Sequence, residues 1–227
     1  MTHPEFTPVA PDRWSRKTRS LIVDGRDRSR YDNPLFLILA HHEPLLRAWY
    51  RFTGRLVTRT SLTDREREML TLRISWRTGT PLQWGEHVEA GLRAGLSREE
   101  IASLAGEEIS AGWSRRERML IEAADQLWGA GRIGGDLLAR LADHFTAKEM
   151  LEVMFIAGNA AMIAAVINTL GIAGGFEGLR NLTALPPSGP VAAGRIEPIG
   201  AALDPSGSDP SGSDPSGSRS GRTTPTT

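Results

Sequence analysis

The chain has 227 residues, 40% of them hydrophobic, which is enough for one sizeable core. Its 27 Lys and Arg residues balance its 27 Asp and Glu residues, so it lacks the basic excess of a nucleic-acid-binding protein and we expect no nucleic-acid partner. The sequence contains no cysteine. Disulfides, zinc-thiolate sites, iron-sulfur clusters and thiol redox catalysis are therefore excluded, because each needs a cysteine sulfur.

The N-terminal residues 1–30 are rich in arginine and proline. We expect them to form an arm that packs on the domain or on a neighbouring subunit. Prolines and charges stand where a secretory signal needs an apolar core of roughly 7 to 15 residues. We therefore expect a cytoplasmic protein.

A repeated helix-start signal is the clearest local pattern. Four segments have Ser or Thr followed three residues later by Glu, and they span Thr63–Glu66, Ser97–Glu100, Ser114–Glu117 and Thr146–Glu149. In such a capping box the hydroxyl and the carboxylate bond backbone amides at the start of a helix that would otherwise lack partners. An apolar periodic run follows each box, so the pattern predicts four helices.

Three further helices are predicted from proline and glycine positions. One follows Asn33-Pro34, one runs from about Pro81 to Ala94 before Gly95, and one covers about 136–145. No stretch shows the alternation of a strand between turn residues. The class is therefore all-α, with about seven helices in one domain at residues 31–180.

The stretch from Val153 to Phe176 carries no charge and reaches the length of about 20 residues that spans a bilayer. Alanine and glycine dominate it, and it contains Asn159, Asn168 and Thr169, which drive insertion weakly. We expect a buried helix and no membrane partner.

Residues 186–227 differ in composition from the rest of the chain, with three copies of the pentapeptide DPSGS at 204–208, 209–213 and 214–218. A tract rich in proline, glycine and serine buries too little apolar surface to offset its ordering entropy. We predict a disordered tail.

The helix after Pro81 carries the first candidate site residues. Its positions 83, 87, 90, 91 and 94 share one face and read Gln, His, Ala, Gly and Ala. Such small residues let another helix approach closely, which confines His87 and favours a tuned imidazole. The alternative is a buried histidine that only hydrogen-bonds a neighbour.

Glu68 lies in the preceding predicted helix, on a face shared with Leu72, Ser75 and Trp76. A carboxyl group in such partly apolar surroundings has a raised pKa and suits proton transfer. The alternative is an exposed charge paired with Arg65 or Arg67.

The histidines leave a metal site open as a further alternative. His41 and His42 are adjacent, and neighbouring helical residues diverge by about 100°, so both reach one metal only if the chain bends at Pro44. A site from His41 or His42, His87, His144 and Glu68 would suit a metal oxygenase, although our main interpretation contains no metal. The sequence has no phosphate-binding glycine loop, nucleophile elbow or dinucleotide fingerprint.

Four segments together resemble one protein family. They read NPLFLILAHHEPLLRAWYRF, LTDREREMLTLRISWRTGTPLQWGEHVEAGLRAGLSREEIASL, ERMLIEAADQLW and GNAAMIAAVINTLGI. They are similar to the carboxymuconolactone decarboxylase family, which includes the AhpD alkyl hydroperoxidases, over about 33–173 and most clearly from Glu68 to Leu96. The resemblance implies an AhpD-like all-α fold, assembly into homo-oligomers (trimers or hexamers) and pockets near subunit contacts.

The peroxidase branch of this family uses a glutamate, a CxxC pair and a histidine. Glu68 and His87 match its acidic and imidazole members, whereas Thr80 and Gln83 stand at the two cysteine positions. Without thiols, the disulfide-linked reduction of peroxides cannot operate here.

The decarboxylase branch implies chemistry without a metal or an organic cofactor. Loss of CO2 from a carboxylated enol-lactone leaves a dienolate, so the site must stabilise an oxyanion and deliver a proton to carbon. The resemblance makes His87 the proton donor, Glu68 its orienting partner and Gln83 an amide donor to the enolate, with Thr80, Trp84, Asn159 and Ala160 as pocket residues.

Two departures from the decarboxylase pattern indicate a larger and less charged pocket. Leu82-Gln83-Trp84 replaces the expected Tyr-Glu-Trp, and Ala160 stands near an expected Tyr. A small-molecule substrate that is decarboxylated or isomerised is the leading hypothesis. The alternatives are a non-catalytic ligand-binding or assembly module and the metal oxygenase.

Overall fold

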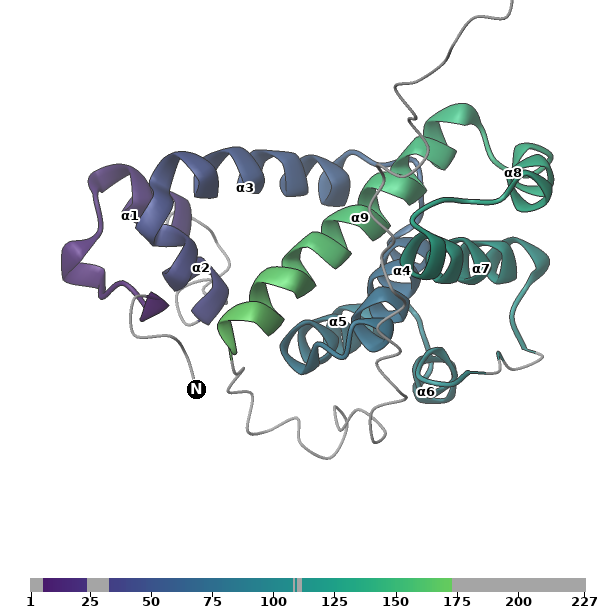
Figure 1. Ribbon diagram of the computed structural model, residues 1–227, viewed down its shortest axis with the longest axis horizontal. Helices are drawn as coiled ribbons and strands as arrows, with labels where there is room; N and C mark the ends of the chain where they lie inside the picture. Colours follow the sequence, from purple (N-terminus) through teal and green to yellow (C-terminus); the bar gives the residue numbers. More distant parts are fainter. Residues whose placement is uncertain (1–5, 24–32, 108, 110–111, 173–227) are drawn as a thin grey trace, which may run out of the picture. The chain divides into compact units, whose positions relative to one another are not determined.

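The computed structural model describes residues 6–23, 33–107, 109 and 112–172. The chain divides into units at 1–192 and 193–227, and all described residues lie in the first. These residues form two short 3-10 helices, Pro11–Arg13 and Ala40–His42, and nine α-helices (Figure 1): α1 Arg16–Val23, α2 Pro34–Leu39, α3 Glu43–Thr58, α4 Asp64–Arg77, α5 Pro81–Arg93, α6 Arg98–Leu104, α7 Arg115–Ala130, α8 Gly135–Ala142 and α9 Ala147–Leu170. The predicted all-α class is confirmed. The predicted boundaries at 30–31 and 180–186, and the predicted tail, lie outside the described residues.

All four predicted capping boxes are present, and they start α4, α6, α7 and α9. In α4, the Thr63 hydroxyl accepts the N–H of Glu66 at 3.2 Å, and the Glu66 carboxylate accepts the N–H of Thr63 at 2.9 Å. These paired bonds satisfy backbone donors that a helix start leaves without partners.

The N-terminal part contains more helices than predicted. The single helix expected after Asn33-Pro34 is divided into α2 and α3 by the 3-10 turn, because Pro44 lacks an N–H and its ring clashes with a continuing helix. His42 caps α3, with its ring Nδ1 accepting the N–H of Leu45. The expected arm contains α1, whose Ile22 packs in an apolar cluster with Trp14 and Leu46.

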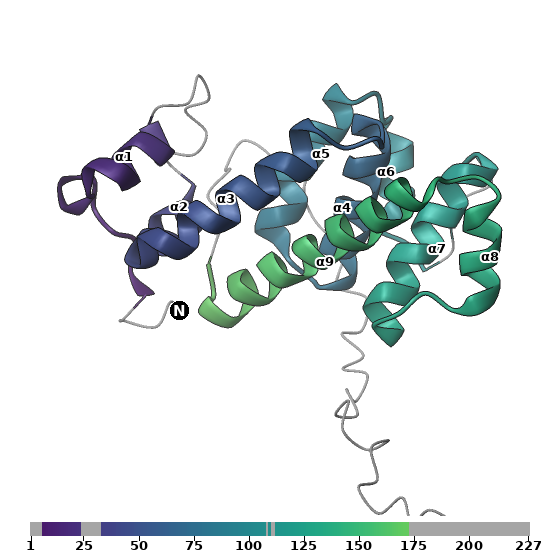
Figure 2. The same ribbon diagram turned by 90° about the horizontal axis from the view of Figure 1, so that it is seen from above.

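Helix α4 is the centre of the described fold. It packs against α5, α6, α7 and α9, and Figure 2 shows it between them. All its residues from Glu66 to Trp76 are buried, whereas a surface helix buries only one stripe. The charged side chains of α4 consequently lie inside the protein, where they need partners.

Arg73 is the most deeply buried of these charges, with 0% of its surface exposed. Its guanidinium donates to both carboxylate oxygens of Asp125 at 2.7 and 2.8 Å, and to the backbone carbonyls of Leu104 and Gly106. Arg77 donates to the same carboxylate, and both guanidinium groups lie over the Trp76 ring. This cluster joins α4 to α7 and to the end of α6.

Helix α9 supplies much of the remaining core. Its Val153, Ile156, Ala157 and Ala160 pack with Leu70 and residues of α7. Within the described residues it is the one helix long and apolar enough to cross a membrane by length and composition, a test that a core helix of a soluble protein also passes. Its outer side exposes Leu151, Phe155 and Met162, and Phe155 stacks edge-to-face on Phe52 of α3. The expected homo-oligomer stays a prediction.

Candidate functional site

The connection between α4 and α5 determines how the candidate residues meet. Gly79 has a φ of 60°, a left-handed conformation that glycine adopts without a steric penalty, and it lets the chain reverse after α4. Thr80 continues the reversal by donating its N–H to the carbonyl of Ser75, and Pro81 begins α5. The two helices therefore pack side by side and bring Glu68 opposite His87.

Glu68 and His87 form a direct pair. Nδ1 of His87 lies 2.6 Å from Oε2 of Glu68, a short charge-assisted contact. Glu68 is buried, with 7% of its side chain exposed, whereas His87 keeps 30% exposed. The carboxylate thus holds the ring from inside the protein, and the rest of the imidazole faces an open space.

Burial opposes the charge on both groups, but their mutual attraction outweighs it. Burial disfavours the imidazolium, yet the hydrogen bond and charge of Glu68, with a further contribution from Glu86, raise the pKa of His87 above its ordinary value. Burial also disfavours the Glu68 carboxylate, yet His87 and Arg67 lower the pKa of Glu68, so the raised pKa expected from its apolar surroundings is wrong. The pair therefore favours an imidazolium-carboxylate state.

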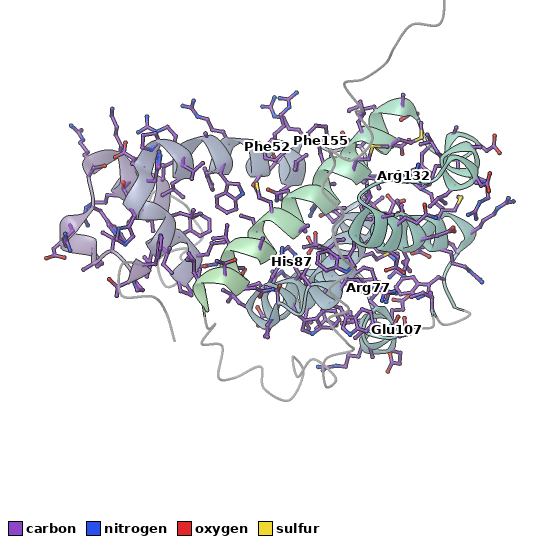
Figure 3. The ribbon with its side chains drawn as sticks, viewed as in Figure 1. Phe52, Arg77, His87, Glu107, Arg132 and Phe155 are labelled. Carbon is purple, nitrogen blue, oxygen red and sulfur yellow. The ribbon has the colours of Figure 1, made fainter. Side chains whose placement is uncertain are left out.

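The open space is a cavity of about 200 Å³ between α2, α3, α4, α5 and α9, and His87 lies between α5 and α9 in Figure 3. The cavity is smaller than the roughly 300–1,000 Å³ of most ligand pockets, so only a small molecule would fit. The apolar wall consists of Leu35, Phe36, Trp49, Leu56, Val57, Ile156, Ala160, Ile163 and Ile167. The polar lining consists of Asn33, Thr53, Arg67, Glu68, Thr71, Gln83, Glu86, His87 and Asn159.

Gln83, Asn159 and Ala160 also line this cavity, as does the Glu68–His87 pair. Nε2 of Gln83 donates to the carbonyl of Ala160 at 3.3 Å, whereas its buried Oε1 has no hydrogen-bond partner among the described residues. Oδ1 of Asn159 accepts bonds from Trp49 and Thr53. Because Ala160 holds one N–H of Gln83, the expected donor role of Gln83 depends on its second N–H.

The structure places the other two predicted pocket residues outside the cavity lining. Thr80 is fully buried, and its hydroxyl lies 2.8 Å from that of Thr78. Trp84 packs in an apolar cluster with Met69 and Leu72, and its Nε1 has no hydrogen-bond partner within the described part of the chain. Thr80, which stands at the first cysteine position of the peroxidase branch, therefore faces the α4–α5 turn and not the cavity.

Two charged residues of the cavity were not predicted as site residues. Arg67 donates to Glu68 Oε1 at 3.3 Å and to Asp64 at 2.8 Å, and its buried Nε lacks a partner among the described residues. Glu86 accepts a bond from Asn33 Nδ2 at 2.6 Å. Glu86 is adjacent to His87 in the sequence and about 100° away from it around the helix, so it does not share the helix face of Gln83 and His87. It nevertheless lines the cavity, which extends around α5 to Asn33.

Of the residues of the alternative metal site, Glu68 and His87 are in contact, but His41 and His42 are engaged elsewhere. His41 Nε2 bonds the backbone carbonyl of Thr7 at 2.8 Å, and His42 caps α3. No group of three or more His, Asp or Glu side chains suited to a metal occurs within residues 6–23, 33–107, 109 and 112–172. The donor set of the metal-oxygenase hypothesis is therefore dispersed in the described fold.

The helical arrangement is an AhpD-like fold. It is similar to an alkylhydroperoxidase AhpD core structure, an uncharacterized peroxidase-related protein from Ralstonia eutropha JMP134, with a TM-score of 0.69 and 21% identity over 78% of this chain and 96% of that one. It is also similar to an uncharacterized peroxidase-related protein from Silicibacter sp. TM1040, with a TM-score of 0.65 and 17% identity over 76% and 94% of the two chains.

Part of the sequence matches a family profile. The profile of the Carboxymuconolactone decarboxylase family matches residues 43–126, which include Glu68, Gln83 and His87. Over this segment the cysteine-free chain is similar to the carboxymuconolactone decarboxylase family. No curated protein matches the chain.

Proposed function

We propose that the protein is a cofactor-independent enzyme that moves a proton on a small enolisable or lactone substrate, by isomerisation or by decarboxylation. The observation that carries this proposal is the 2.6 Å contact between Glu68 and His87 at the wall of a largely apolar cavity. An acid-base pair positioned at the wall of a largely apolar cavity is what such a reaction needs.

His87 would act through its other ring nitrogen. Nδ1 donates to Glu68, which fixes the tautomer and the orientation of the ring, so Nε2 is left for the ligand. The raised pKa of His87 favours the imidazolium, in which Nε2 also carries a proton. As the carbonyl oxygen of a substrate gains negative charge, the N–H of Nε2 would donate a hydrogen bond to it and stabilise the enolate.

In a decarboxylation, the bond between the carboxylate and its carbon breaks and the electron pair moves toward the carbonyl oxygen. CO2 leaves, and a proton is then delivered to the carbon. In an isomerisation, a proton leaves one carbon and returns to another, so no co-reactant is needed. The second N–H of Gln83 and the Arg67 guanidinium are further donors beside the oxyanion.

Conversion of α-angelica lactone, a small enol-lactone that isomerises through a dienolate, tests the proposal. Wild-type protein is expected to accelerate the isomerisation followed by proton NMR, and His87→Ala to lower kcat by about 100- to 10,000-fold. Glu89→Gln, an exposed position on the same helix, is the matched control and should leave kcat unchanged. Binding of the lactone without conversion by wild type would instead support a ligand-binding module.

A further inference from the structure

Glu86 is a second carboxyl group in the wall of the cavity, next to His87 on α5. Its Oε1 accepts a hydrogen bond from Asn33 Nδ2 at 2.6 Å. Its Oε2 has no hydrogen-bond or ion-pair partner among the residues that the structure describes. This oxygen is not fully buried, so it keeps some accessible surface. One oxygen of Glu86 is therefore open to a ligand.

Glu68 differs from Glu86 in this respect. Oε1 of Glu68 is bonded to Arg67 and its Oε2 to His87, and the side chain is almost fully buried. Both oxygens are thus occupied, and Glu68 can act on a ligand only through the ring of His87. Within the described lining, Glu86 is the carboxyl group with an oxygen left for a substrate atom.

The charges around the cavity all come from two helices. Arg67 and Glu68 lie on α4, Glu86 and His87 lie on α5, and the lining residues from α2, α3 and α9 are uncharged. Burial raises the pKa of Glu86, while the charge of His87 and the bond from Asn33 oppose this rise. Burial therefore makes the ionised carboxylate a stronger base than that of an exposed glutamate. It also makes the protonated acid hold its proton more tightly.

We infer that Glu86 is the group that exchanges a proton with substrate carbon, while His87 holds the substrate oxygen; this inference rests on the proposed function. In the isomerisation, Glu86 Oε2 would take a proton from the carbon beside the carbonyl, and the C–H electron pair moves to the oxygen bonded by His87 Nε2. The Glu86 carboxylic acid then returns the proton to the far carbon of the dienolate. In the decarboxylation, protonated Glu86 protonates the carbon that CO2 has left, and water reprotonates Glu86.

A purely structural role for Glu86 makes different predictions. Asn33 caps α2 through Oδ1, which accepts the N–H of Leu35, so its bond to Glu86 could simply anchor this helix to α5. Glu86→Gln keeps an oxygen that accepts the Asn33 bond and has nearly the same shape, but it has no titratable proton. Asn33→Ala removes the anchoring bond and leaves the carboxyl group in place.

The experiment compares these two variants on α-angelica lactone. Glu86→Gln is expected to lower kcat by about 100- to 10,000-fold with little change in KM, and to remove the limb of the pH profile that reports Glu86. Glu86→Asp should recover part of the rate, and Glu89→Gln should leave both rate and profile unchanged. Wild-type kcat and pH profile in Glu86→Gln, or an equal loss in Asn33→Ala, would overturn the inference.

The same series separates the inference from the proposed function. If His87→Ala loses activity while Glu86→Gln keeps it, the proposed function stands and the role of Glu86 falls. If wild type does not isomerise the lactone, the proposed function fails, and labelling with diisopropylcarbodiimide, which attacks protonated carboxyl groups, decides on Glu86 alone. Mass spectrometry should find Glu86 labelled faster than Glu68 and Glu89 at neutral pH, and labelling no faster than Glu89 would overturn the inference.

Discussion

Helix α4 carries two buried charged clusters that differ in how completely protein groups enclose them. Near its C-terminal end, Arg73 has no exposed surface and bonds Asp125 and two backbone carbonyls. Near its N-terminal end, Glu68 is also buried, but its partner His87 keeps 30% of its side chain exposed at the cavity. One helix therefore holds a cluster directed entirely inward and a pair that opens onto a space for a ligand.

The comparison separates charges that hold the fold from charges available for chemistry. A buried ion is costly unless partners satisfy it, and Arg73 uses its Nε, Nη1 and Nη2 on protein groups. His87 leaves Nε2 without a bond to the described residues, and Glu86 leaves Oε2. Removing a charge from the first cluster should therefore affect stability, whereas removing one from the second should affect turnover.

Asp125→Asn should produce the largest loss of stability. Without this carboxylate, Arg73 keeps a fully buried positive charge with no ionic partner, so the free energy of unfolding should fall by about 3–5 kcal/mol. Urea denaturation measures the change. Glu122→Gln on the same helix breaks only an exposed pair with Arg140 and should cost no more than about 1 kcal/mol. Equal losses in the two variants would contradict the special role of the closed cluster.

Glu68→Gln should instead affect the reaction. The amide can still accept the bond from His87 Nδ1, but it lacks the charge that raises the pKa of His87. We expect kcat for α-angelica lactone to fall about 100-fold. The alkaline limb of its pH profile should move to lower pH, because the charge of Glu68 no longer offsets the effect of burial on the imidazole. An unchanged limb would show that His87 is not the titrating acid.

The pair also has a stability signature. The pKa of His87 is raised on folding, so its contribution is complete below the unfolded value of about 6.5 and is lost as pH rises through the folded value. The pKa of Glu68 is lowered, so its contribution is present above about 4.3 and is lost as pH falls through the folded value. The stabilisation from the pair is therefore greatest between these two pH values, and Glu68→Gln should flatten this part of the stability profile.

The sequence predicts the local features of this fold better than the tertiary ones. The four capping boxes depend only on residues three apart, and all four are confirmed. The family resemblance places Glu68 and His87 in one relay, and the structure brings them into contact. The break between α2 and α3 could have been predicted from Pro44, whose effect on a preceding helix is local.

The role of Glu86 depends on contacts that no local pattern contains. Its partner Asn33 is far away in the sequence, and the cavity reaches Glu86 only because α2 packs beside α5. The Arg73–Asp125 cluster also depends on tertiary packing, because its two residues come from different helices. Helical periodicity indicates which residues share a face of one helix, but it does not indicate what a second helix leaves open beside it.

The smallest effect is expected at Thr80, which stands where the peroxidase branch has its first cysteine. The Thr80 hydroxyl lies in the α4–α5 turn, fully buried and 2.8 Å from the hydroxyl of Thr78, outside the cavity lining. Thr80→Ala should therefore cost about 1 kcal/mol of unfolding free energy, the net value of one hydrogen bond. Because the turn keeps Gly79 and Pro81, Glu68 and His87 should stay in register and kcat should stay at the wild-type value. A large loss of kcat with the fold intact would mean that Thr80 faces the substrate, and that the chemistry extends from the open pair into the turn.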